Sequence, residues 1–124
     1  MALARANPLT GGLEDEWVYY AAYFQGRWSA PRQLAGPTRH INRNAIAAVG
    51  GRRTALVFSH GGQNGGRLAL AVGASSRNGP ADRWGRPEPL KTDGQNYACD
   101  ACCEGSRLHV VYDQSLQGGA GTGR

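Results

Sequence analysis

The chain has 124 residues, of which 40% are hydrophobic and 19% charged, and these values fit one globular domain with a modest core. It has no apolar run of about 18 residues, which excludes a membrane-spanning helix. The formal net charge is +5, which indicates either attraction to anionic ligands or a plain arginine-rich composition. Since no dense basic run exists and the aromatic residues are not interleaved with one, we expect neither a nucleic-acid nor a membrane partner.

The first twelve residues lack the apolar stretch of a signal peptide. The compartment is therefore open between the cytoplasm and a secreted protein whose leader is missing.

Short apolar runs separated by turn residues predict an all-β chain, because 19 glycines and six prolines punctuate the sequence. No apolar pattern of helical period extends over ten residues. Residues 1–16 are expected to form a lead-in, and residues 116–124 a disordered glycine-rich tail. The expected strands are Trp17–Tyr23, Trp28–Leu34, Ala45–Val49, Thr54–Ser59, Leu68–Ala74, Trp84–Leu90, Tyr97–Cys103 and Leu108–Asp113. Pro31 makes the second of these an edge strand, since proline donates no hydrogen bond to a ladder.

An internal repeat runs through the chain. The segments Gly26–Leu34 and Asp82–Leu90 align with a spacing of 56 residues at Arg27/Arg83, Trp28/Trp84, Pro31/Pro87 and Leu34/Leu90. A spacing of 54 residues follows at Asn42/Asn96, Ala47/Ala101, Gly51/Gly105 and Val57/Val111. Four short strands in a repeat of about 50 residues are typical of a β-propeller blade.

The repeat resembles the sialidase-type propeller with its Asp-box repeats, over Glu16–Gln114. The Asp-box, S-x-D-x-G-x-x-W, joins the third and fourth strands of a blade in that family. Ser75, Gly79 and Trp84 match it here, whereas Arg77 occupies the aspartate position and two extra residues precede the tryptophan. The resemblance implies antiparallel four-stranded blades, with about two of the six blades of such a propeller in this chain.

The positions of the two tryptophan turns divide the chain into a half blade at 17–34, a full blade at 45–90 and a half blade at 97–115. A lone blade leaves both of its faces exposed, so it needs neighbours. Two arrangements provide them. The chain is the remainder of a longer propeller, or three copies close a ring head to tail through their complementary halves.

The resemblance places the ligand at the end opposite the Asp-box turns. The candidate ligand-binding residues in the loops there are Arg39, His40, Arg43, His60, Asp93, Tyr97 and Asp113, with Asn42 and Asn96 beside them. This polar, partly cationic set suits a carboxylated sugar, although loops are also polar simply because they are solvated. The residues expected to hold the repeat together instead are Trp28, Pro31, Trp84, Pro87, Ser75 and Gly79.

The resemblance implies a sialidase-like module that cleaves or recognises glycans or other anionic carbohydrates, as an exo-glycosidase would. The family uses an arginine triad, an aspartate acid/base and a tyrosine nucleophile, and no residue of this chain can be assigned to those catalytic roles from spacing. The alternatives are a lectin-like propeller that binds sugars without cleaving them, and an inactive fragment. We expect no cofactor.

Three cysteines, Cys99, Cys102 and Cys103, precede His109 and are open to two interpretations. The C-x-x-C spacing with a later histidine is typical of zinc sites. On a strand, however, Cys99 and Cys102 point to opposite faces, which favours small apolar residues in a packed inner strand and no metal. Asp100 beside them is either buried with a hydrogen-bond partner or exposed in a central channel.

Overall fold

The protein is described by a computed structural model, which covers residues 2–6, 13–38, 41, 43–61, 66–92 and 94–115. These residues form an all-β structure of antiparallel sheets, and no helix occurs among them. The described residues accordingly include no helix long and apolar enough to cross a membrane. The all-β prediction is therefore confirmed.

The first sheet has the order β1–β2–β5, with β1 at Ala2–Ala6, β2 at Leu13–Tyr20 and β5 at Arg32–Thr38. A small hairpin extends it, with β3 at Tyr23–Phe24 and β4 at Arg27–Trp28. The expected lead-in thus contains one strand and the start of another. Sequence reasoning missed β1 because alanine has a low strand propensity, so that its pairing with β2 decides the conformation.

The strand expected at 28–34 is interrupted. β4 ends at Trp28 and β5 begins at Arg32, with Pro31 in the gap. Proline offers no amide hydrogen to a ladder, so the strand breaks there. β5, which follows the break, lies at the edge of the first sheet, as predicted.

The middle sheet has the order β10–β8–β7–β6, with β9 also paired to β8. Its strands are β6 (Arg43–Val49), β7 (Arg53–His60), β8 (Arg67–Ala74), β9 (Arg83–Trp84) and β10 (Glu88–Pro89). The predicted strands at 45–49, 54–59 and 68–74 are confirmed and are longer by one or two residues. The single strand predicted at 84–90 is two short strands, because Pro87 interrupts it as Pro31 interrupts the first copy.

The last sheet is a hairpin of β11 (Cys99–Glu104) and β12 (Arg107–Tyr112). β11 begins two residues later than expected. The amide hydrogens of Tyr97 and Ala98 bond to the Asp113 carboxylate instead of to a neighbouring strand. The side chain of Asp113 therefore closes the open end of this hairpin.

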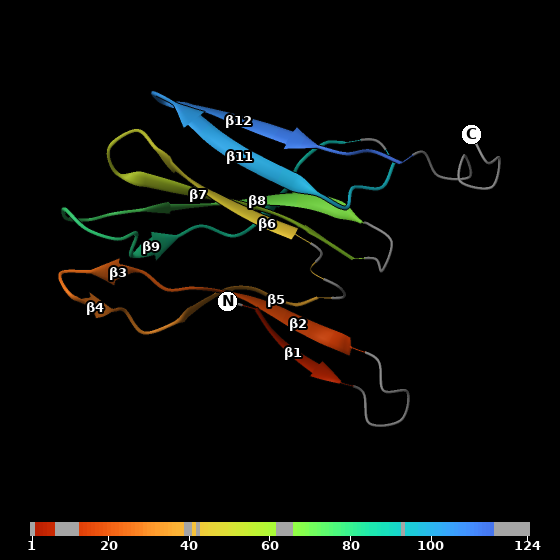
Figure 1. Ribbon diagram of the computed structural model, residues 1–124, viewed down its shortest axis with the longest axis horizontal. Helices are drawn as coiled ribbons and strands as arrows, with labels where there is room; N and C mark the ends of the chain where they lie inside the picture. Colours follow the sequence, from red (N-terminus) through yellow and green to blue (C-terminus); the bar gives the residue numbers. More distant parts are fainter. Residues whose placement is uncertain are drawn as a thin grey trace.

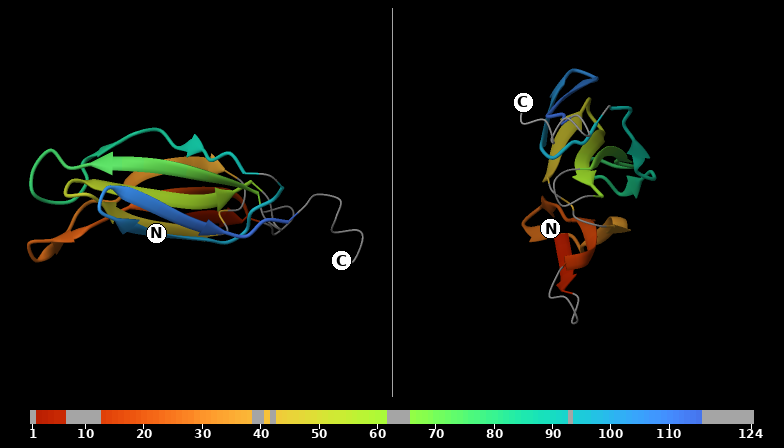
Figure 2. Two further views of the ribbon diagram at one scale, coloured as in Figure 1. Left: turned by 90° about the horizontal axis from the view of Figure 1, so that it is seen from above. Right: turned by 90° about the vertical axis from the view of Figure 1, so that its right-hand side faces the viewer.

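The three sheets lie in layers, with the middle sheet between the other two (Figure 1). The right-hand view of Figure 2 shows the same stacking from the end of the molecule. Alternate side chains of β7 face the two neighbours. Phe58 packs with Val18 of β2 in the main core, whereas the Ser59 hydroxyl donates a 2.6 Å hydrogen bond to the Tyr97 carbonyl beside β11. β7 is consequently the most buried strand of the described residues.

The internal repeat is offset by one residue between the two hairpins. Val49 pairs with Arg53 across the β6–β7 turn, whereas Glu104 pairs with Arg107 across a turn one residue shorter. Ala47 lies opposite Ala55 on the face of the middle sheet that is turned toward the last sheet. Its sequence match Ala101 lies on the same face of β11 as Cys99. That face is turned toward the middle sheet, so the two alanines point in opposite directions. The alignment of residues 47 and 101 is therefore wrong by one position.

Candidate functional site

A cleft lies between β5 of the first sheet and β7, β8 and β10 of the middle sheet. Its volume is about 530 Å³. Phe58, Ala69, Pro87 and Pro89 make most of its wall apolar, while the polar groups come from Thr38, His60 and Arg86. A concave apolar site with a few convergent polar groups is the usual form of a small-ligand site.

Among the described residues, His60 is the sequence-predicted ligand residue that lies in this cleft. Its Nδ1 is 3.2 Å from the Thr38 hydroxyl, which fixes the imidazole between the first two sheets. Burial lowers the pKa of His60 below its ordinary value, so the ring is neutral at pH 7. A neutral imidazole offers one donor and one acceptor, and a ligand at this point meets a hydrogen-bonding group rather than a charge.

Arg86 supplies the positive charge of the cleft. It lies between β9 and β10, next to Pro87, and its side chain is exposed along the cleft wall. Sequence reasoning missed Arg86 because it sits within the segment expected to be an ordinary fourth strand. The proline interruption turns that segment into a loop, and loop residues are available to ligands.

Three other predicted residues lie at the same end of the molecule but on the other side of β7. Arg43 pairs with Ser59 in the β6–β7 ladder, and Tyr97 and Asp113 bond to each other around that position. The structure thus separates these three from His60. Arg39, His40, Asn42 and Asp93 lie outside the described residues.

The side chain of Asp113 stabilises the backbone at the start of the last hairpin. Its Oδ1 accepts hydrogen bonds from the amides of Ala98 at 3.0 Å and Tyr97 at 2.7 Å, and these bonds lower the pKa of the carboxyl. A carboxylate that holds two backbone amides is poorly placed to bind a ligand as well. The Asn96 side chain, which is buried, donates to the Asp113 carbonyl at 2.8 Å and strengthens the same junction.

We expect Asp113→Ala to destabilise the protein by about 1 kcal/mol at neutral pH, because it removes the hydrogen bonds to the amides of Tyr97 and Ala98. The loss stays small because solvent screens the exposed carboxylate. Because the pKa of Asp113 is lower in the folded state, its contribution to the free energy of unfolding is fully present above the pKa of the unfolded state. The contribution is lost as the pH falls through the pKa of the folded state. Urea unfolding of both proteins between about pH 7 and pH 3 measures the difference. Glu88→Ala removes another exposed carboxylate and serves as the control. An equal loss in both variants contradicts the assignment.

The residues of the Asp-box resemblance form the loop between β8 and β9. The Ser75 hydroxyl donates to the Gly79 carbonyl at 2.7 Å. The Asp82 carboxylate accepts bonds from the Ser76 amide at 3.1 Å and from the Ser76 hydroxyl. The aspartate that closes this loop is therefore Asp82, five residues after the position where the motif expects it, and sequence reasoning did not identify it.

The two repeat tryptophans differ in environment. Trp84 packs on Gly73, and its ring centroid is 4.9 Å from that of Tyr20 on the preceding sheet. Trp28 occupies the matching position of the repeat on β4, in the separate β3–β4 hairpin, and is 66% exposed, in edge contact with Tyr23. The described residues place no sheet before the first one, so nothing covers Trp28 as Tyr20 covers Trp84.

The cysteines alternate along β11 as expected for a strand. Cys99 is half-buried, with its thiol 3.7 Å from the Val57 carbonyl, whereas Cys102 is exposed, contrary to the expectation of an inner packed position. Asp100 is also exposed. No group of three metal-ligating side chains occurs in the part of the chain that the structure describes.

Comparison with known proteins gives no relationship for this chain. No protein-family model, curated protein or solved structure matches it.

Proposed function

We propose that the chain is a segment of a sialidase-like propeller and that it binds an anionic sugar in the cleft between its first two sheets. The supporting observation is the cleft itself, in which one guanidinium group and one fixed, neutral imidazole border an apolar wall. A carboxylated pyranose presents matching groups, since it has a carboxylate, several hydroxyls and an apolar ring face. Arginine is well suited to bind a carboxylate through two parallel hydrogen bonds.

The layered sheets support the propeller interpretation. The middle sheet is an antiparallel meander β6–β7–β8 that continues into β9 and β10, in the order of a four-stranded blade. The first sheet corresponds to the second, third and fourth strands of a blade, because β1 pairs with β2 as β7 pairs with β8. The last sheet corresponds to the first and second strands. Both partial blades therefore include a second strand, which favours the remainder of a longer propeller over a ring of three copies.

The described part of the cleft favours binding over hydrolysis. Hydrolysis by the sialidase family needs an aspartate as acid/base beside a tyrosine nucleophile, in place of the usual two carboxyl groups. The described lining contributes Arg86, His60 and Thr38 as polar side chains, and none of these is a carboxylic acid. We therefore place the recognition of a sugar acid ahead of exo-sialidase activity.

We expect Arg86→Gln to weaken the binding of N-acetylneuraminic acid by about tenfold, which corresponds to the loss of one charged contact. Isothermal titration calorimetry or saturation-transfer NMR on the full chain measures the effect. Arg107→Gln, which removes a guanidinium at the other end of the molecule, is the control and should leave the affinity unchanged. Equal affinity in wild type and the Arg86 variant rejects the cleft as the site. Cleavage of a fluorogenic sialoside by the wild type would establish the enzyme instead.

A further inference from the structure

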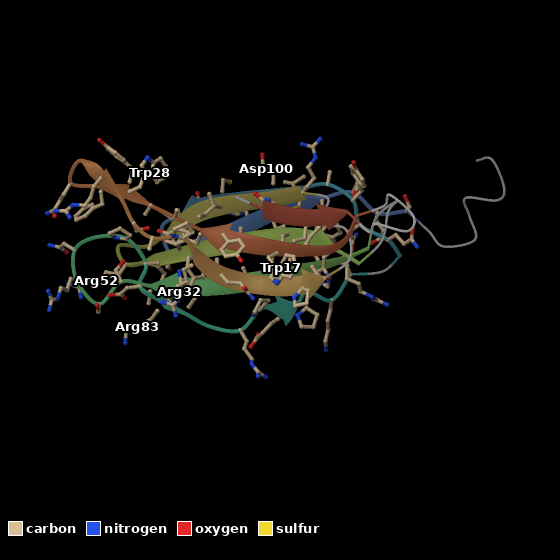
Figure 3. The ribbon with its side chains drawn as sticks, turned by 90° about the horizontal axis from the view of Figure 1, so that it is seen from below. Trp17, Trp28, Arg32, Arg52, Arg83 and Asp100 are labelled. Carbon is tan, nitrogen blue, oxygen red and sulfur yellow. The ribbon has the colours of Figure 1, made fainter. Side chains whose placement is uncertain are left out.

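The arginines that are scattered along the sequence gather at one end of the molecule. The turns β3–β4, β6–β7 and β11–β12 and the loop between β8 and β9 all lie there, since Gly50 bonds to Gly105 and Ser75 bonds to Arg52. Figure 3 shows Trp28, Arg32, Arg52 and Arg83 at this end. The described arginines that belong to it are Arg27, Arg32, Arg52, Arg53, Arg77, Arg83 and Arg107.

These seven residues are half of the 14 lysines and arginines of the chain. The carboxylates described at the same end are Asp82 and Glu104. Glu104 pairs with His109, and no described carboxylate forms a salt bridge with any of the seven guanidinium groups. We call this surface the arginine end. Its excess of positive charge equals the formal net charge of the whole chain, and a concentrated field of this kind attracts polyanions.

Two connected grooves cross the arginine end. The first, of about 390 Å³, lies between the start of β5 and the loop 75–82, and its polar lining includes Ser29, Arg32, Arg77, Asn78 and Asp82. The second, of about 250 Å³, lies beside the β3–β4 hairpin and is lined by Phe24, Gln25, Arg27 and Trp28. Ser29 and Pro80 border both grooves, so the two form one path.

Each part of this path offers a different chemistry. Guanidinium groups occur in both grooves, so negative charges can be bound at intervals along a chain-like ligand. The exposed indole of Trp28 provides an apolar surface for a ring. The Asn78 amide and the Ser29 hydroxyl provide hydrogen-bond acceptors as well as donors, whereas the Asp82 carboxylate is occupied with Ser76. Sugar hydroxyls use both, so a neutral amide and a hydroxyl between the guanidinium groups match a chain in which hydroxyls separate the acidic groups.

We infer that the arginine end binds an acidic polysaccharide, in an extended conformation, along the path from Asn78 to Trp28. This site lies at the opposite end of the sheets from His60 and does not depend on the cleft proposed above. Arg32 also maintains the path itself, because its Nη1 donates to the Asp82 carbonyl at 2.5 Å and joins the first sheet to the loop 75–82.

The test uses the full chain and three probes of equal length, namely an oligogalacturonate, a neutral maltodextrin and a single-stranded oligothymidylate. The triple variant Arg27→Gln/Arg77→Gln/Arg83→Gln leaves Arg32 in place. We expect it to lower the affinity for oligogalacturonate by about tenfold or more and to flatten the dependence of affinity on salt. Trp28→Ala should lower the affinity and leave the salt dependence unchanged, because it removes no charge.

Arg86→Gln is the matched control, since it removes a guanidinium from the cleft at the other end. It should bind oligogalacturonate as the wild type does. The inference is overturned if the triple variant retains full affinity, if maltodextrin binds equally well, if oligothymidylate binds more tightly than oligogalacturonate, or if Arg86→Gln alone abolishes binding. The last result would transfer the ligand to the cleft. If the wild-type chain binds oligogalacturonate at the arginine end but does not bind N-acetylneuraminic acid in the cleft, only the proposed function of the cleft is rejected.

Discussion

Phe58→Ala is expected to destabilise the protein by about 3–5 kcal/mol, the range for removing a large aromatic side chain from a core. Phe58 is 2% exposed and packs with Val18, Leu56 and Ala69 where the first and middle sheets meet. Few other large side chains are fully buried in this core, so repacking of the neighbouring side chains fills little of the cavity that the substitution leaves. Denaturant unfolding followed by tryptophan fluorescence measures the loss.

A matched substitution separates this loss from a general sensitivity to truncation. Val111 on β12 is 72% exposed, so Val111→Ala should change the stability by less than about 0.5 kcal/mol. If Phe58→Ala fails to fold, Phe58→Leu keeps most of the volume and should remain folded with a smaller loss. A Phe58→Ala protein as stable as Val111→Ala would show that the two sheets do not pack through this residue.

Gly73→Ala is expected to cost about 1–3 kcal/mol, the usual penalty for inserting a methyl group into a packed site. A Cβ atom at Gly73 would lie 2.6 Å from Cε2 of Trp84 and 2.8 Å from its Cζ2. The indole also packs against Tyr20 of the first sheet, so a shift of the indole disturbs the contact between the two sheets. The emission spectrum of the variant should report the displaced indole along with the lowered unfolding midpoint.

Gly51 in the β6–β7 turn provides the control for that substitution. An added Cβ at Gly51 meets no atom within 4 Å, and the residue does not adopt a left-handed conformation. Gly51→Ala should therefore be neutral, or stabilising by about 0.4–1 kcal/mol through a less flexible unfolded chain. Equal stabilities of the two alanine variants would contradict the close contact of Gly73 with Trp84.

The two ends of the layered sheets have different chemistry. The end with His60 and Arg86 has an apolar cleft with two convergent polar groups, and its carboxylate Asp113 is occupied with backbone amides. The arginine end has an open path with many charges and an exposed tryptophan. The first suits one sugar residue and the second suits a polymer, and the reciprocal arginine controls test them separately.

Several features followed from the sequence alone because they depend on neighbouring residues. Strand type at 45–49, 54–59 and 68–74 was predictable from short apolar runs between turn residues. Proline positions also have a local meaning, since Pro31 and Pro87 interrupt the predicted strands, and β5 after Pro31 lies at a sheet edge as predicted. His60 lies in the cleft, at the end of β7, and its role as a ligand-binding residue stays a prediction.

Other features required the tertiary structure because they depend on long-range pairing. β1 is a strand because β2 lies beside it, and the repeat slips by one residue because one turn is shorter. Trp28 and Trp84 share a motif yet differ in burial, since only Trp84 has a preceding sheet against it. Above all, arginines that show no run in the sequence meet at one end. In antiparallel sheets every second turn lies at the same end of the strands. Residues about 25 to 55 positions apart in the sequence therefore become neighbours at the arginine end.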